Sequence, residues 1–379
     1  MIDCNQFVGG LAQAGIGFVT GVPDSLLKNI CACITDQLPK EQHIIAANEG
    51  AAVAMAIGHY LATQRPALVY MQNSGLGNAI NPLVSLADPL VYGIPMVLMI
   101  GWRGEILSGG AQAKDEPQHK KQGLVTLPLL ETLGIPHVVV DGAAPGITGL
   151  LADLAAQAIA RPGPVALVVR KDSFAPYSGK PDTDARPWPS REEALRTLLG
   201  VLPESSLIVA TTGYASRELF ELRRALGQGH DGDFLCVGGM GHASQIAAGI
   251  ALAKPERLVV CVDGDGAMLM HTGALAASAG CRNLLHVVIN NGSHESVGGQ
   301  PTMANVLTLA GVAQSLGYEL AQRTETLDDL RSLLQKAVSD RGGWFIEVMC
   351  RTGARSDLGR PDRPPAEAKA DFMAAAAGS

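Results

Sequence analysis

The sequence is poor in charged and aromatic side chains and contains no long apolar segment. Of its 379 residues only 17% are charged and 4% aromatic, whereas 47% are hydrophobic, with alanine and glycine abundant. This composition predicts closely packed helices and sheets and excludes extensive disorder. No apolar run approaches the length that crosses a bilayer, and residues 1–5 lack the basic flank and apolar stretch of a secretory signal. We therefore expect a cytoplasmic protein without membrane partners.

The chain also lacks a concentrated basic face and a regular cysteine spacing. Its formal net charge of −7 argues against nucleic-acid partners, so any anion must be held by local groups. The seven cysteines are scattered, an odd number without paired metal-ligand spacing, and the Cys31/Cys33 pair alone is a weak signal. We expect reduced, mostly buried thiols.

Short apolar runs alternate with longer Ala/Leu-rich stretches, and this rhythm predicts parallel sheets covered by helices. The expected strands are 18–20, 44–46, 67–70, 96–100, 137–140, 165–169, 206–210, 234–237, 258–262, 285–289 and 344–348. A polar, proline-rich stretch interrupts the rhythm, and it restarts at a capping box formed by Ser190 and Glu193.

The chain exceeds the size at which one core stops growing, which predicts two domains. We predict an α/β fold class with two doubly wound parallel-sheet domains and no central third domain. The predicted parts are a first domain at 1–177, a linker at 178–190, a second domain at 191–350 and a surface tail at 351–379.

Two polar segments follow predicted strands in the second domain. Asp265 lies in Gly264-Asp265-Gly266, before a helix expected from Ala267 to Ala279, and Asn291 follows the strand 285–289. Because parallel strands end at one edge of a sheet, both side chains can converge there. Their oxygens suit Mg²⁺, and the glycines let the backbone approach an anion. A simple pair of glycine turns is the alternative, while a Rossmann site would need a third glycine.

The Gly-Asp-Gly segment with Asn290-Asn291 downstream resembles the diphosphate-binding motif of thiamine diphosphate enzymes. The resemblance implies that Asp265 and Asn291 bind Mg²⁺ through their side chains and Ser293 through its carbonyl. It also implies cofactor contacts from Gly264, Gly266, Ala267, Gly239 and Met240. Met240 aligns with the apolar wedge that holds the cofactor bent, and an ordinary core methionine is the competing interpretation.

Glu49 lies at a predicted strand end, immediately before an alanine-rich helix. A solvated glutamate favoured by the helix dipole is the alternative reading of such a position. The resemblance implies instead that Glu49 shares a proton with the pyrimidine nitrogen N1′ of thiamine diphosphate and so activates the cofactor. Asn78, in the segment 72–78, is the second cofactor contact expected in this domain.

Several further segments resemble the phosphonopyruvate decarboxylase family and, less closely, the sulfopyruvate decarboxylase family. They are 21–27, 72–78, 115–119, 294–300 and 353–361. The resemblance spans essentially the whole chain, and it implies a pyrimidine-binding domain followed directly by a diphosphate-binding domain. It also implies a homo-oligomer with active sites at the subunit interface.

A small anionic 2-oxo acid needs local donors, and few are available. We expect Ser25, Lys114, His119 and His294 to bind the substrate, with Glu49, His119 and His294 as catalytic groups. Each has a plainer alternative: a helix cap for Ser25, a solvated basic loop around Lys114, and a lone histidine without a role. Arg355 and Arg360 in the tail are weaker candidates for closing over the substrate.

The expected function is thiamine diphosphate- and Mg²⁺-dependent decarboxylation of phosphonopyruvate to phosphonoacetaldehyde and CO₂. Sulfopyruvate decarboxylation is an open alternative, because a sulfonate and a phosphonate differ by one ionisable oxygen. Carboligation onto a second oxo acid is another, because the same bound intermediate serves both reactions.

Overall fold

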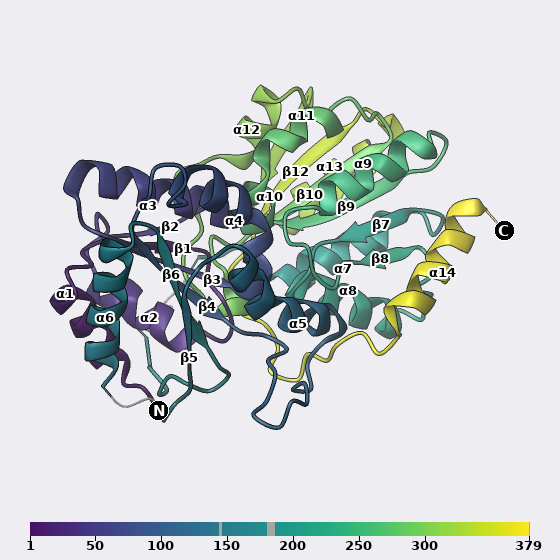
Figure 1. The fold of residues 1–379 in the computed structure, drawn as a ribbon. Coiled ribbons are helices and arrows are strands. Elements are labelled where there is room, and N and C mark those ends of the chain that lie inside the picture. Colours follow the sequence, from purple (N-terminus) through teal and green to yellow (C-terminus); the bar gives the residue numbers. More distant parts are fainter. Residues whose placement is uncertain (144–145, 180–185, 379) are drawn as a thin grey trace. The chain divides into compact units, whose positions relative to one another are not determined.

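The computed structural model describes residues 1–143, 146–179 and 186–378, and the chain divides into two compact units (Figure 1). The first unit comprises Met1–Asp182 with Ser296–Gln300, and the second comprises Thr183–Glu295 with Pro301–Ser379. Positions 180–185 of the predicted linker lie outside the described residues. The predicted domain boundaries stay predictions.

The first unit is a six-stranded parallel sheet in the order β2-β1-β3-β4-β6-β5, with helices on both faces (Figure 1). Its strands are β1 (Val19–Gly21), β2 (His43–Ile45), β3 (Ala67–Gln72), β4 (Met96–Gly101), β5 (His137–Val140) and β6 (Pro164–Val169). Its helices are α1 (Cys4–Gln13), α2 (Lys28–Gln37), α3 (Glu49–Thr63), α4 (Leu76–Pro82), α5 (Pro117–Thr132) and α6 (Ile147–Ala160), with short η1 (Asn73–Gly75) and η2 (Leu83–Ala87).

Central strands of this sheet are buried on both faces. In β3, Leu68 and Tyr70 pack into the core on one side, whereas Val69 and Met71 pack into the core on the other. Successive side chains of a strand point to opposite faces, so a strand covered on both sides needs an unbroken apolar run. The apolar runs were therefore correctly interpreted as strands.

The second unit repeats this plan with a six-stranded parallel sheet in the order β11-β12-β10-β9-β7-β8. Its strands are β7 (Leu207–Ala210), β8 (Asp233–Leu235), β9 (Val259–Gly264), β10 (Leu284–Asn290), β11 (Leu320–Thr324) and β12 (Trp344–Met349). Its helices are α7 (Arg191–Val201), α8 (Tyr214–Ala225), α9 (Ala243–Ala253), α10 (Asp265–Met270), α11 (Leu275–Ser278), α12 (Leu309–Ser315), α13 (Leu327–Asp340) and α14 (Pro365–Ala377), with short η3 (Thr272–Ala274), η4 (Glu295–Val297) and η5 (Met303–Val306).

The predicted fold class of two doubly wound parallel sheets is confirmed, and so is the capping box. The Glu193 N–H donates to Ser190 Oγ at 3.2 Å, and the Ser190 N–H donates to Glu193 Oε2 at 2.8 Å. These two bonds satisfy backbone groups that the first turn of α7 would otherwise leave unpaired. They fix where the second unit's first helix begins.

Three elements differ from the sequence-based expectation. β11 was missed because it is an edge strand in which only Thr324 is buried, so it has no apolar run. The helix expected over 267–279 was wrong, because α10 ends at Met270 and the chain leaves helical geometry at His271. The tail includes α14, which is fixed to the second unit through Phe372, whose ring centroid lies 5.7 Å from that of Phe234.

All seven cysteines lie within the described residues, and each is free and buried, as expected. No helix among the described residues is both long and apolar enough to cross a lipid bilayer.

Candidate functional site

The first unit gathers polar side chains where its parallel strands end. Ser25 follows β1, Glu49 follows β2, Asn78 follows β3 and Arg103 follows β4. Carboxyl ends of parallel strands share one edge of the sheet, which is where open α/β sheets bind their ligands. Three of these residues were predicted from the sequence, and Arg103 was not.

Glu49 is held in one place by two neighbours. It opens α3, is 5% exposed, and its Oε2 accepts a hydrogen bond from Asn78 Nδ2 at 2.7 Å. A Cβ added to Gly75 would come within 2.4 Å of Glu49 Oε1, so only glycine leaves room for this carboxylate. The structure thus brings together Glu49 and Asn78, the two cofactor contacts predicted in this domain, and a solvated helix-start glutamate does not describe so buried a group.

Arg103 organises a second polar group at the same edge. Its Nε donates to Asp115 Oδ2 at 2.8 Å and its Nη2 pairs with Asp115 Oδ1, while Nη1 donates to Ser25 Oγ at 2.9 Å. Burial is the largest single influence and would raise the pKa of Asp115, but the hydrogen bonds and charge of Arg103, together with the Gly104 N–H, lower that pKa on balance. Three of the five guanidinium donors are thereby committed, which leaves two for a ligand.

Asp24 lies wholly buried beside this group. Its Oδ1 accepts a hydrogen bond from Gln72 Nε2 at 2.7 Å, and its Oδ2 has no hydrogen-bond partner among the described residues. Burial raises the pKa of Asp24 to about 6, the hydrogen bond from Gln72 partly opposing that rise. A Cβ on Gly101, at the end of β4, would come within 1.9 Å of Asp24 Oδ2. The sequence places these residues at strand ends but does not reveal that they touch.

The two predicted basic residues of this region differ in their surroundings. His119 is half-buried in α5, and its Nδ1 is buried without a hydrogen-bond partner among the described residues. Burial and, next, the Arg103 charge lower the pKa of His119 to about 4, so the ring is neutral at neutral pH and can offer a hydrogen bond but not a charge. Lys114 is exposed and has no ion-pair partner within the described ranges.

In the second unit the predicted cofactor residues also follow parallel strands. Gly239 and Met240 follow β8, Asp265 follows β9 as the first residue of α10, and Asn291 follows β10. These strands belong to one sheet, so their carboxyl ends share an edge.

Asp265 is a carboxylate almost removed from water, at 3% exposure. Its Oδ2 accepts a hydrogen bond from Thr302 Oγ1, and the Gly292 N–H also lies within hydrogen-bonding reach of the carboxylate. Burial nevertheless raises the pKa of Asp265 to about 6. A cation beside this group would offset the burial and favour the charged carboxylate, so its surroundings fit a metal ligand. Thr302 was not predicted.

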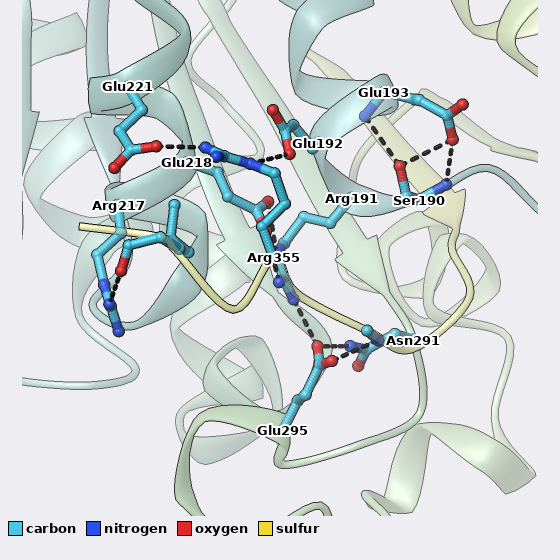
Figure 2. Close-up of polar contacts among 12 residues, drawn as sticks. Ser190, Arg191, Glu192, Glu193, Arg217, Glu218, Glu221, Asn291, Glu295 and Arg355 are labelled. Atoms are coloured by element: carbon cyan, nitrogen blue, oxygen red, sulfur yellow. Dashed lines mark hydrogen bonds and ion pairs between the residues drawn. The ribbon is translucent and has the colours of Figure 1, made fainter. Parts of the chain in front are cut away.

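Asn291 lies one residue beyond β10 and is 6% exposed. Its Oδ1 accepts the Ser293 N–H at 3.0 Å, and its Nδ2 donates to Glu295 Oε2 at 3.0 Å (Figure 2). Because the Gly292 N–H reaches Asp265, the loop that carries Asn291 and Ser293 runs beside the Asp265 carboxylate. A carboxylate, an amide oxygen and a loop carbonyl form an oxygen donor set of the kind that Mg²⁺ prefers.

His294 closes this loop against α10. A Cβ on Gly266 would come within 2.8 Å of His294 Cε1, so the glycine of the Gly-Asp-Gly segment makes room for the ring. Burial lowers the pKa of His294 to about 4, which makes the ring neutral at neutral pH. The side chain therefore has no charge to offer a substrate anion.

Met240 sits in a glycine-rich loop rather than in a core. The flanking Gly239 and Gly241 have φ of 67° and 89°, a left-handed conformation that favours glycine. A Cβ on Gly241 would come within 2.8 Å of Met270 Cβ, so the loop lies against α10. Met240 itself is only partly buried, which argues against the alternative of an ordinary core methionine.

A second group of possible ligands lies inside the sheet. Cys261 and Asp263 on β9 and His286 on β10 are fully buried, and their ligand atoms lie within 4.8 Å of one another. His286 Nε2 is 3.6 Å from Asp263 Oδ2, and Asp263 Oδ1 accepts the Gly264 N–H at 3.0 Å. The group thus supports the turn that leads into Asp265 from within the core. The predicted strands include Cys261 and His286 but end before Asp263, and no ligand role was predicted for any of the three.

Arg355 does not have the open guanidinium that was expected of it. Its side chain pairs with Glu192 at 2.9 Å and with Glu221 (Figure 2). It also pairs with Asp357 at 3.0 Å. A guanidinium already bonded to three carboxylates is poorly placed to attract a further anion. These pairings argue against the suggestion that Arg355 closes over the substrate, which stays a prediction, and Arg360 is exposed.

Comparisons with known proteins match both units. Residues 5–124 match the family described as the thiamine pyrophosphate enzyme N-terminal TPP binding domain, and residues 213–348 match the C-terminal TPP binding domain. The phosphonopyruvate decarboxylase of Streptomyces viridochromogenes is 35% identical, covering 99% of this chain and 95% of that protein. The one of Streptomyces hygroscopicus is 36% identical, covering 98% and 93%. The sulfopyruvate decarboxylase of Methanosarcina acetivorans is 28% identical, covering 90% of each.

The position of Glu49 can be tested with two alanine substitutions in adjoining turns. Gly75→Ala places a methyl group in the space of the Glu49 carboxylate, whereas a Cβ on Gly77 meets nothing within 4 Å. We expect Gly75→Ala to weaken thiamine diphosphate binding about 10- to 100-fold, because that is the effect of losing one hydrogen bond to a charged group. Gly77→Ala should bind as the wild type does and melt no lower. Titration calorimetry and thermal denaturation measure both; equal affinity in Gly75→Ala would refute the geometry.

Proposed function

The chain belongs to the phosphonopyruvate decarboxylase family of thiamine diphosphate enzymes, and we propose that it converts phosphonopyruvate to phosphonoacetaldehyde and CO₂. The observation that carries the proposal is the 35% and 36% identity to two phosphonopyruvate decarboxylases over nearly the full length of all three chains. The intact set of Glu49, Asp265 and Asn291 supports an active enzyme rather than a binding protein.

Sulfopyruvate decarboxylation is the second candidate. It is favoured by the 28% identity to a sulfopyruvate decarboxylase over 90% of both chains, a value below that of the phosphonopyruvate enzymes. Both substrates are 2-oxo acids with a second acid group at the far carbon. The two activities would therefore use the same cofactor residues and differ in how the second acid group is held.

Thiamine diphosphate, when bound with Mg²⁺, supplies an electron sink that accepts the electrons left by departing CO₂. In our proposal Asp265, Asn291 and the Ser293 carbonyl hold the metal ion, and Gly264, Gly266 and Ala267 lie at the diphosphate. Glu49 holds a proton at N1′ of the pyrimidine, while Asn78 keeps the Glu49 carboxylate in place. Gly239 and Met240 support the thiamine ring system.

Arg103 and Ser25 are proposed to hold the phosphonate. The two already touch, and Arg103 retains free donors in the planar arrangement that suits a phosphonate or carboxylate. Asp115 keeps the guanidinium oriented, and the neutral His119 is the proposed source of a further hydrogen bond. Lys114 and His294 are the other proposed contacts of the substrate. His119 and His294 are also proposed to position or protonate the reacting substrate.

A homo-oligomer with active sites at the subunit interface completes the proposal. The first unit carries exposed apolar side chains on α3 and in the turn after η2, including Leu61 at 69%, Leu90 at 95% and Tyr92 at 71%. Large exposed apolar side chains of this kind are common where a protein meets a partner. They support self-association through the first unit.

The direct test is decarboxylation with purified protein. We expect CO₂ and aldehyde release from phosphonopyruvate only when thiamine diphosphate and Mg²⁺ are both supplied, with a higher kcat/KM than for sulfopyruvate. A higher kcat/KM for sulfopyruvate would transfer the function to the second candidate. As a control, Glu49→Gln should lose turnover yet bind thiamine diphosphate within about tenfold of wild type, since glutamine keeps the shape but cannot share the proton. Persistent turnover in that variant would contradict the role of Glu49.

The role of Arg103 predicts a change in substrate affinity. Arg103→Ala should raise the KM for phosphonopyruvate about 10- to 100-fold, the loss of charge-assisted hydrogen bonds, with a smaller change in kcat. Arg103→Lys keeps the charge but not the planar arrangement of donors, so its KM should lie between those of the wild type and Arg103→Ala. The exposed Arg65→Ala is the matched control and should leave both constants unchanged. Steady-state kinetics measure the three variants, and an unchanged KM in Arg103→Ala would exclude Arg103 as the phosphonate contact.

The oligomer predicts a sedimentation result. At micromolar concentration, with thiamine diphosphate and Mg²⁺ present, active protein should sediment as a dimer or larger assembly, because a site shared between subunits requires at least two chains. Replacing Leu90 with glutamate should shift the protein toward monomer if the exposed apolar turn is part of the interface. Full activity in a purely monomeric fraction would refute the shared site.

A further inference from the structure

Asn291 is the innermost member of an ion-pair network that runs outward through the second unit. Its Nδ2 donates to Glu295 Oε2 at 3.0 Å, and the same oxygen accepts from Arg191 Nη1 at 2.7 Å (Figure 2). Arg191 in turn binds Glu218 through both Nε and Nη2, each at 2.8 Å. The network therefore reaches from the loop after β10 to the start of α7 and into α8.

The outer part of this network is rigid. Arg191 is 5% exposed and Glu218 is 2% exposed, and the fork-to-fork pairing fixes both planes. The guanidinium also lies over the Tyr214 ring, 5.1 Å from its centroid. Arg191 is the first residue of α7, so the capping box at Ser190 sets where its backbone begins. Glu295 is thus held by a group that is itself buried and bonded on its other side.

Glu295 has a third bond that fixes its remaining oxygen. The Gly353 N–H donates to Glu295 Oε1, which ties the carboxylate to the chain just beyond β12. With Oε1 on Gly353 and Oε2 on Arg191, the carboxylate cannot turn away from Asn291. An ionised carboxylate only accepts hydrogen bonds, so it can face the amide nitrogen of Asn291 but not its oxygen.

An asparagine amide has two nearly isosteric ends, and only its oxygen can bind a metal ion. Here the Ser293 N–H faces Oδ1 and the Glu295 carboxylate faces Nδ2, so both neighbours favour the same orientation. Oδ1 keeps a second lone pair besides the one used by Ser293. A partner that orients a metal ligand is typically worth 10- to 100-fold in metal affinity.

We propose that Glu295, fixed by Arg191 and Gly353, is a positioning residue that presents the Asn291 amide oxygen to the divalent cation. The inference rests on the metal-binding role of Asn291 in the proposed function, and it adds a partner for that role. Glu295 itself touches neither cofactor nor substrate in this account. The comparable partner of Asn290 is Glu347, which accepts from Asn290 Nδ2 at 2.7 Å inside the sheet.

The test measures metal binding apart from turnover. Free Mn²⁺ is quantified by its electron paramagnetic resonance signal in the presence of thiamine diphosphate, for the wild type and for Glu295→Ala. We expect Glu295→Ala to bind Mn²⁺ about 10- to 100-fold more weakly. The lysine of Arg191→Lys cannot bridge Glu218 and Glu295 as the planar guanidinium does. This variant should therefore also lose Mn²⁺ affinity, but less than Glu295→Ala does.

A matched control separates positioning from charge. Glu192→Ala also removes one carboxylate beside Arg191, but Glu192 pairs with Arg355 and not with Asn291 (Figure 2). It should bind Mn²⁺ within about twofold of wild type. If Glu192→Ala loses as much affinity as Glu295→Ala, net charge explains the effect and the proposal is overturned.

In a double variant, the expected effect of removing Glu295 on Mn²⁺ affinity is reversed or absent. In Asn291→Asp both side-chain oxygens are ligands, so orientation no longer matters and Glu295 only repels the new carboxylate. Removing Glu295 in this background should leave Mn²⁺ affinity unchanged or raise it, whereas a merely structural Glu295 would lower it again. Unchanged affinity in Glu295→Ala alone would also overturn the proposal. Failure of the wild type to decarboxylate phosphonopyruvate would affect only the proposed substrate, because these readouts need no turnover.

Discussion

A carboxylate kept almost out of water is the feature around which the second unit's site is arranged. Asp265 is placed at the carboxyl end of β9, where burial outweighs the hydrogen bonds from Thr302 and the backbone and raises its pKa to about 6. Ionising a carboxylate in this environment costs free energy unless a positive charge lies nearby. A divalent cation beside the carboxylate would offset that cost, which is the physical reason for proposing Asp265 as a metal ligand.

The first unit has the same architecture, but its polar side chains are held in a different way. Glu49 accepts a hydrogen bond from the neutral amide of Asn78 rather than from a positive side chain, which suits the role proposed for it beside the cofactor. Arg103, by contrast, is bound to Asp115 and Ser25, so its charge is oriented rather than free. Parallel sheets permit both arrangements because successive strands deliver their following loops to one edge in a fixed order. The two units therefore differ in their loops and not in their framework.

Much of this could be predicted from the sequence because buried parallel strands are unbroken apolar runs. β3, β9 and β10 were located within a residue or two for that reason. Asp265 and Asn291 directly follow the ends of β9 and β10, and Glu49 begins the helix after β2. What was missed depends on contacts between distant segments. Arg103 with Ser25, Thr302 with Asp265 and Arg191 with Glu295 are separated by 78, 37 and 104 positions, and no periodicity reveals such pairs. β11 was missed because an exposed edge strand has no apolar run.

The Arg191, Glu218 and Glu295 network illustrates why a buried ion pair is better explained by geometry than by stability. The free-energy cost of removing charges from water nearly cancels the gain from their attraction. Such a network therefore adds little to the free energy of unfolding compared with apolar side chains of equal size. Its two glutamates share one arginine, which leaves a negative charge close to Asn291. An apolar cluster could pack α7 against α8 equally well, but it could not hold the Asn291 amide in one orientation. The position of the network beside Asn291, the proposed metal ligand, therefore accounts for a charge arrangement that packing alone does not require.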